Sequence, residues 1–214
     1  MEPVAWASVH EFVIGSVERP KTAKRTRSGF GPRAVRVPQG DKDMCVLAPC
    51  AYVATSEKHS LPSAPALTLY EDVDQQRLLC YVETPQELDG ERHHVVRDAQ
   101  DQVIGTLRRV PPKRPFKHTW RIDQPGHPEI VGRNELASGS AKEVAGRAAG
   151  RFVSGVFDDM LNPGEGDSPT KYRSLEWRSG DDIVITSEGS TKVNVRADWV
   201  DRRLAFAFAL IGDN

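Results

Sequence analysis

The chain has 214 residues, a length that suits one well-filled core and a small appendage. Its net charge of -1 at pH 7 gives no overall attraction to nucleic acid or to an anionic membrane, so any such attraction has to come from a local patch. No window reaches the ~20 apolar residues of a membrane-spanning helix, and the N-terminus lacks the basic start of a signal peptide. We therefore expect a soluble, cytoplasmic protein without a transmembrane segment, with peripheral attachment to the membrane as the open alternative.

The cysteine usage argues against a disulfide framework and against a metal site. Cys45, Cys50 and Cys80 are too few and odd in number. The spacing of Cys45 and Cys50, without a nearby histidine, is a poor zinc signature. We predict free thiols and expect neither a metal nor a cofactor.

The first 65 residues carry nine Lys and Arg against six Asp and Glu. Within them, residues 19–42 mix basic residues with Gly, Pro, Ser and Thr, and so bury too little surface to offset the entropy of ordering. We predict a basic, largely disordered N-terminal extension over 1–65 and a folded domain over 66–214. Residues 19–42 could attract nucleic acid or a membrane surface by charge, but Phe30 is the lone aromatic of this segment, so we expect no specific nucleic-acid binding.

From residue 67 to residue 133 the chain consists of short segments whose apolar residues lie two apart, as in Trp120 and Ile122. Such alternation indicates half-buried strands, and the intervening Asp, Gly, Pro and Gln clusters are typical of hairpin connections. We therefore predict an antiparallel meander. Its six predicted strands lie within 67–72, 77–83, 93–98, 102–109, 117–123 and 128–133.

One segment has helical periodicity instead. Larger apolar residues recur every four positions between Val144 and Met160, and Ser140 with Glu143 forms a capping-box pattern. We predict an amphipathic helix near 140–161. Three further strands follow, within 173–179, 181–188 and 192–198.

The last segment, "RRLAFAFALIGD", can be interpreted in two ways. Large and small apolar residues alternate as in a strand, but the small positions are alanines, and Asp198 or Asp201 could stabilise a helix start. We favour the helix. A helix that is apolar all round must be surrounded by protein, so its large side chains are predicted to form a structural core: Leu204, Phe206, Phe208, Leu210 and Ile211.

A strand, "KVNVRADWVD", that leads into a wholly apolar C-terminal helix resembles the superfamily of tubby C-terminal, phospholipid scramblase and LURP-one-related domains, in its bacterial, function-unknown branch. The hairpin "VVRDAQDQVIGTLRR" is similar to a repeated motif of that superfamily, "TWRIDQPGHPEIVGR" looks like a second copy, and "LEWRSGDDIVIT" is a weaker third. The resemblance covers roughly residues 66–214. It implies a mainly β fold, a closed antiparallel barrel of about twelve strands around a central hydrophobic C-terminal helix.

The resemblance implies a lipid-associated or scaffold-like role and brings no catalytic set. The local candidate is the basic loop 108–121, where a proline-stiffened segment could meet anionic phospholipid headgroups at about 1 kcal/mol per basic residue. A solvated loop with no ligand is the competing interpretation. The candidate headgroup ligands are Arg108, Arg109, Lys113, Arg114, Lys117 and Arg121.

No grouping of residues points to an enzyme. His93 and His94 are adjacent and would face opposite sides of a strand, and no nucleophile, metalloprotease or phosphate-loop motif occurs. We expect a non-enzymatic barrel that associates with anionic lipid or with a protein partner. A purely structural or protein-interaction domain without lipid binding is the alternative, and an enzyme of unknown class is the remote one.

Overall fold

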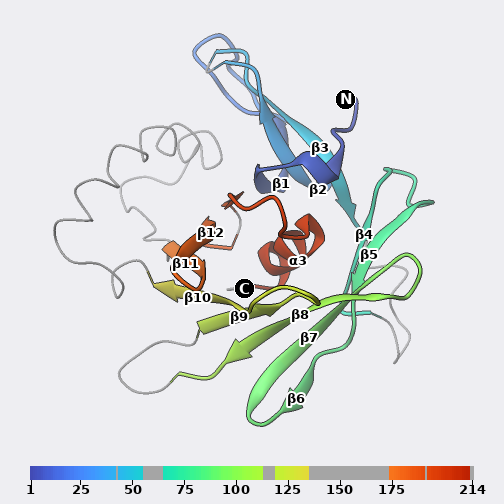
Figure 1. The fold of residues 1–214 in the computed structure, drawn as a ribbon. Helices are drawn as coiled ribbons and strands as arrows, with labels where there is room; N and C mark the ends of the chain where they lie inside the picture. The colour runs from blue at the N-terminus through green and yellow to red at the C-terminus, as the bar shows by residue number, and fades with distance from the viewer. Residues whose placement is uncertain (42, 55–64, 113–118, 135–173, 191, 213–214) are drawn as a thin grey trace, which may run out of the picture.

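The computed structural model describes residues 1–41, 43–54, 65–112, 119–134, 174–190 and 192–212. Figure 1 shows a ring of strands around one central helix, α3 (Arg202–Ile211). A short 3-10 turn, η1 (Trp6–Ser8), precedes the first strand. The strands are β1 (Glu11–Arg19), β2 (Gly29–Gln39), β3 (Val46–Val53), β4 (Leu67–Tyr70), β5 (Leu78–Val82), β6 (Gln86–Leu88), β7 (Glu91–Asp98), β8 (Val103–Val110), β9 (Thr119–Asp123), β10 (Ile130–Asn134), β11 (Ser174–Ser179), β12 (Asp182–Glu188) and β13 (Lys192–Val195).

The strands close into an antiparallel barrel of twelve strands. Neighbours along the chain pair with each other, β1 pairs with β13, and the pairing of β5 with β7 completes the ring. The short strand β6 pairs with β7 beside the ring. The predicted mainly β, closed barrel with a C-terminal helix is therefore confirmed, and the arrangement is consistent with a tubby-like fold.

The predicted strands between residues 67 and 198 are confirmed as β4, β5 and β7 to β13. Strand β6 lies in a segment that was predicted to be a connection, because three exposed residues carry no apolar alternation. The predicted amphipathic helix near 140–161 lies outside the described residues.

The predicted disordered extension over 1–65 is wrong for residues 11–53, because β1, β2 and β3 occupy the ring between β13 and β4. The predicted boundary at residue 66 therefore does not separate the barrel from a tail. The physical reason is burial at particular positions: Phe12, Ile14 and Val35 belong to the main core. Average composition over the segment conceals these positions.

Helix α3 fills the barrel. Asp201 caps its start by accepting a hydrogen bond from the backbone N–H of Arg203, as proposed for this acid. Every residue from Leu204 to Leu210 is buried, and Ile211 packs against the same core. The predicted core helix is therefore confirmed, and the strand alternative is wrong.

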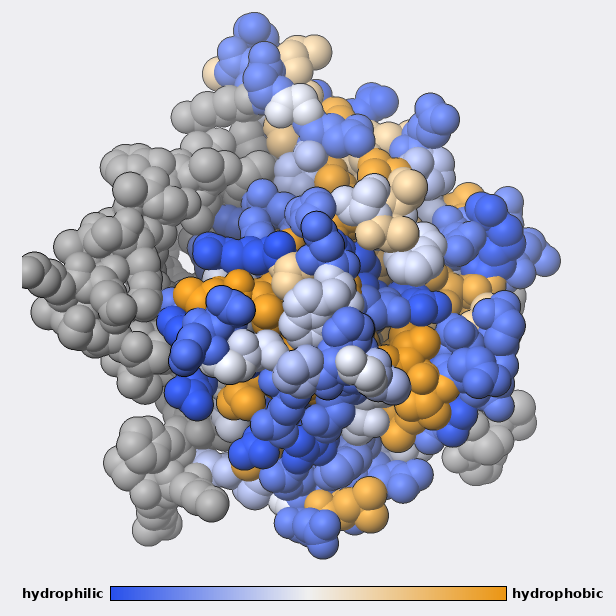
Figure 2. All heavy atoms as spheres, viewed as in Figure 1, coloured by the Kyte–Doolittle hydropathy of each residue, from blue (hydrophilic) through white to orange (hydrophobic). Residues whose placement is uncertain are grey.

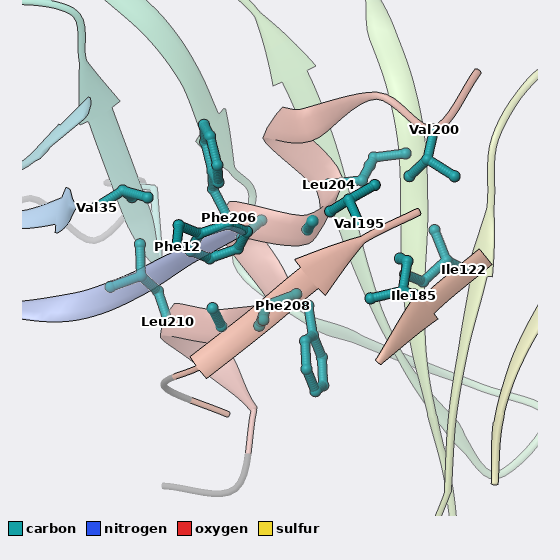
Figure 3. Close-up of a cluster of buried hydrophobic side chains, with 14 of the residues drawn as sticks. Phe12, Val35, Ile122, Ile185, Val195, Val200, Leu204, Phe206, Phe208 and Leu210 are labelled. Carbon is teal, nitrogen blue, oxygen red and sulfur yellow. The ribbon is translucent and has the colours of Figure 1, made fainter. Parts of the chain in front are cut away.

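Aromatic contacts hold α3 against the barrel wall, and Figure 3 labels Phe12, Phe206 and Phe208 among the buried side chains. The Phe206 ring meets Phe12 edge-on with 4.8 Å between the centroids. The Phe208 ring lies edge-on to Trp120 at 5.7 Å and to Trp177 at 4.4 Å. Such pairs add about 0.5 to 1.5 kcal/mol each beyond the area that they bury.

Gly105, in the hairpin "VVRDAQDQVIGTLRR", lies where the neighbouring strand and the helix leave no room for a side chain. A Cβ atom at this position would lie 2.6 Å from the carbonyl oxygen of Asp123 and 2.9 Å from side-chain carbons of Leu204. Strand β8 can therefore approach both β9 and α3 closely only without a side chain at Gly105. This position links the hairpin motif directly to the packing of the central helix.

The N-terminal end of α3 is tied to the chain around it. The buried Arg202 donates to the carbonyl oxygens of Val9 and Val200, each at 2.6 Å. The Arg203 guanidinium lies over the Trp6 ring, 5.2 Å from its centroid. These two arginines therefore attach the start of α3 to η1 and to Val9, which lies just before β1.

Candidate functional site

The structure describes only part of the predicted headgroup site. Lys113, Arg114 and Lys117 lie outside the described residues. Arg108 belongs to β8, and Arg121 belongs to β9. The partners of Arg108, Arg109 and Arg121 show whether the charges of β8 and β9 are available to a ligand.

Arg108 is surrounded by carboxylates on the outer face of the barrel. Its guanidinium donates to Asp123 at 2.5 Å, to Glu91 at 2.8 Å and to Glu129. The hydrogen bond with Asp123, together with these negative charges, raises the pKa of Arg108 above its usual range. Arg121 also contacts Glu129, at 3.2 Å. Both arginines therefore have their charge neutralised by neighbouring acids.

Arg109 points to the other face of β8. Its guanidinium lies 6.0 Å from the centroid of the Trp120 ring, and Trp120 is buried in the main core. Alternation along the strand places Arg108 and Arg109 on opposite faces. The three described members of the predicted site therefore do not share one surface.

A second basic surface lies where the sequence predicted disorder. Residues 19–33, at the end of the β1–β2 hairpin, contain six Lys and Arg and no Asp or Glu. We call this segment the cationic hairpin. Figure 1 shows it projecting from the barrel, and Figure 2 shows mostly hydrophilic side chains at this end of the molecule.

The cationic hairpin is held in place by bonds to the β2–β3 turn. Arg25 donates to the carbonyl oxygens of Pro20 and Cys45, both at 3.0 Å, and Lys24 lies 3.4 Å from Asp43. Irregular pairing between β1 and β2 after Gly15 bends the hairpin. A small second core beneath it contains Val13, Cys45 and Leu47, with Val17 packed against it.

Arg36 anchors the base of the hairpin. Its fully buried side chain donates to the carbonyl oxygens of Gly15, Leu47 and Pro32 and to the Glu18 carboxylate. Burial lowers the pKa of Arg36, while the Glu18 charge acts in the opposite direction. Because four acceptors surround this guanidinium, its desolvation is compensated and β1, β2 and β3 are joined at one point.

Four other cations of the hairpin are exposed, and no ion pair joins them to another described residue: Arg19, Lys21, Arg27 and Arg33. Phe30 lies among them with 71% of its surface exposed. Burial of an aromatic side chain gains roughly 1.5 to 3 kcal/mol, so Phe30 would gain from contact with an apolar partner. Composition identified the basic segment but not its ordered shape.

The three cysteines are a further group of possible functional residues. The predicted free thiols are confirmed, since Cys45, Cys50 and Cys80 form no disulfide. Burial raises the pKa of both Cys50 and Cys80 to about 12, which leaves these thiols protonated and unreactive at neutral pH.

Within the described ranges no cluster of His, Cys, Asp and Glu could hold a metal ion, and no described helix is long and apolar enough to cross a membrane. Comparison with protein-family models, curated proteins and solved structures finds no match. The geometry of the barrel and its surfaces therefore carries the functional assignment.

Proposed function

We propose that this chain is a non-enzymatic binding module of the tubby-like superfamily that docks on an anionic phospholipid surface through the cationic hairpin. The closed barrel around a C-terminal helix supports the superfamily. The observation that carries the function is the group of exposed cations around Phe30 that have no ion-pair partner within the described part of the chain.

The expected strength of docking follows from these side chains. A Lys or Arg near an anionic leaflet contributes about 1 kcal/mol, so the four exposed cations supply about 4 kcal/mol, roughly a thousandfold in partitioning. Insertion of Phe30 at the level of the headgroups adds an apolar contribution that salt does not screen. Docking should therefore weaken at high salt without vanishing entirely.

A membrane fits this surface better than nucleic acid does. Proteins that hold single strands alternate basic groups with several aromatic stacking platforms. The cationic hairpin has one aromatic residue, Phe30, and it lies between Gly29 and Gly31. One ring can enter a headgroup layer, whereas successive bases would lack further rings on which to stack.

We favour the cationic hairpin, rather than the described arginines of the basic loop 108–121, as the contact with lipid. Arg108 and Arg121 are paired with acids, and Arg109 points toward Trp120. A contribution from Lys113, Arg114 and Lys117 stays a prediction. An acidic protein surface would also attract the hairpin. Such a partner would bind the hairpin in solution, in the absence of lipid vesicles.

Sedimentation with vesicles tests the proposal. We compare vesicles of phosphatidylcholine with and without phosphatidylserine, using wild type and the triple variant Lys21→Glu, Arg27→Glu and Arg33→Glu. The matched control reverses three exposed arginines elsewhere, Arg77, Arg133 and Arg196, and changes the net charge equally.

We expect wild type and the control to sediment with phosphatidylserine vesicles and the hairpin variant to stay in solution. Equal sedimentation of the hairpin variant and wild type would overturn docking through the hairpin. Failure of wild type to sediment, with a gel shift of nucleic acid instead, would replace the lipid surface by nucleic acid. A further variant with Lys113, Arg114 and Lys117 changed to Glu measures the contribution of the basic loop.

A further inference from the structure

A separate polar cluster lies on the inner face of the barrel wall. Strands β7, β8 and β9 pair so that Arg92 lies opposite Arg109 and Arg109 lies opposite Trp120. His94 is two residues from Arg92 and faces the same side of β7. We call these four residues the inner polar cluster: Arg92, His94, Arg109 and Trp120. It lies beside Phe208, toward the C-terminal end of α3.

Two members of the cluster are buried without hydrogen-bond partners. His94 is 7% exposed and Trp120 is 1% exposed, and their rings are 5.8 Å apart. Neither nitrogen of the His94 ring, nor the indole nitrogen of Trp120, has a hydrogen-bond partner among the described residues. A buried polar atom without a partner costs about 1 to 3 kcal/mol, so three at one place favour a polar partner bound among them.

The charge around these atoms is positive. Arg109 lies over the Trp120 ring and has no ion pair with any other described residue, whereas Arg92 is paired with Glu87 at 2.6 Å. Two further titratable groups act on His94: the Glu87 carboxylate, whose charge opposes that of the arginines, and His93, which lies 4.0 Å from Glu91 on the opposite face. Burial, followed by the charges of Arg92 and Arg109, lowers the pKa of His94 to about 4.

The hydrogen-bonding capacity of the cluster defines what it can accept. Trp120 and Arg109 have donors only, and a neutral His94 ring has one donor and one acceptor. An oxyanion matches this set because its oxygens accept from the indole and the guanidinium and its charge opposes that of Arg109. A hydrogen phosphate can also donate its own proton to the second imidazole nitrogen.

We infer that the inner polar cluster is a binding site for the phosphate or carboxylate group of a small soluble ligand, held by Trp120, His94 and Arg109. The exposed Arg92 and half-buried Arg109 mark the side from which solvent reaches the site. This site is distinct from the cationic hairpin. Its occupation needs no membrane, so it can hold or fail independently of the proposed docking.

Nuclear magnetic resonance of the full chain tests this inference. The indole N–H signal of Trp120 and the imidazole signals of His94 are followed during titration with inorganic phosphate, with acetate, and with chloride at equal ionic strength. We expect saturable shifts with phosphate or acetate and none with chloride. An oxyanion that prefers protonated His94 tenfold should raise the pKa of His94 by about one unit.

Two variants locate the site. Arg109→Gln should weaken the binding at least tenfold, whereas Arg178→Gln, an arginine on the other face of the sheet beside Glu176, should leave it unchanged. The inference is overturned if neither phosphate nor acetate shifts the Trp120 indole signal more than chloride does. A shift with phosphatidic acid vesicles but not with inorganic phosphate would equally overturn a soluble ligand.

Discussion

Two basic segments of this chain, the β8–β9 segment and the cationic hairpin, differ in how their arginines pair with acids. In the β8–β9 segment, Arg108 is surrounded by Glu91, Asp123 and Glu129, which reach it from neighbouring strands and turns. In the cationic hairpin, exposed cations such as Arg27 and Arg33 have no ion pair with a described residue. Both segments are basic in composition, yet among the described residues Arg108 and Arg121 are paired with acids while four exposed cations of the hairpin are not.

The difference comes from sheet register. The acids that neutralise Arg108 are distant in sequence, and antiparallel pairing brings them within hydrogen-bond distance. The tip of the cationic hairpin, residues 20–28, extends past the last pair of the β1–β2 ladder, Arg19 with Gly29. A basic run therefore predicts a binding surface only where the fold leaves it without partner acids.

The largest expected effect tests whether the base of the cationic hairpin is folded. Arg36→Ala removes a fully buried guanidinium and leaves the Glu18 carboxylate and three carbonyl oxygens without their donor. We expect the free energy of unfolding to fall by about 3 to 5 kcal/mol in chemical denaturation. Arg33→Ala, at an exposed position nearby, should change it by at most about 0.5 kcal/mol. Equal, negligible effects would mean that the segment is disordered.

The next effect is the pH dependence of stability that arises from His94, on the inner face of the sheet opposite to Arg108. His94 has a pKa of about 4 in the folded chain, below its ordinary value of 6.5. Between these two pH values the unfolded chain binds a proton that the folded chain does not, so the free energy of unfolding falls as the pH drops. The full loss is about 3 kcal/mol, and most of it appears below pH 6.5.

His94→Phe removes this titration and should flatten the pH dependence of stability by about that amount. The measurement is denaturant unfolding from pH 7 to pH 4, in buffers without phosphate or carboxylate. A variant whose stability falls as steeply as that of wild type would show that His94 is not buried in its neutral form.

A smaller effect compares the two basic segments directly. Arg108→Met leaves three carboxylates facing one another, and we expect a loss of about 2 kcal/mol in the free energy of unfolding. Arg27→Met, in the cationic hairpin, should change stability by no more than about 0.5 kcal/mol. Thermal unfolding of both variants measures the contrast, and similar losses would contradict it.

Much of the fold follows from the sequence. Alternation predicts β7 and β8 because one face of each strand meets the core, and the alanines of the last segment predict α3 because strands crowd around it. Strand β6 escaped prediction, since its three residues are exposed and carry no apolar pattern. Apolar alternation predicts a strand only where one face of that strand is buried.

Strands β1 to β3 escaped prediction for a different reason. Their core residues, such as Phe12 and Val35, are interrupted by bulges and by a buried Arg36 that looks like a surface residue in the sequence. The sites were only partly predictable for the same reason. Whether an arginine is paired, as Arg108 is, or whether a ring such as that of His94 lacks a partner depends on neighbours that only the register supplies.

The most direct measurement asks which basic segment faces the membrane. Relaxation of backbone amides is recorded by nuclear magnetic resonance on anionic bicelles that carry a paramagnetic lipid headgroup. The account predicts the strongest relaxation enhancement in residues 19–33, centred on Phe30, and little in β8 and β9. The strongest enhancement in β8 and β9, or no enhancement in the cationic hairpin, would contradict it.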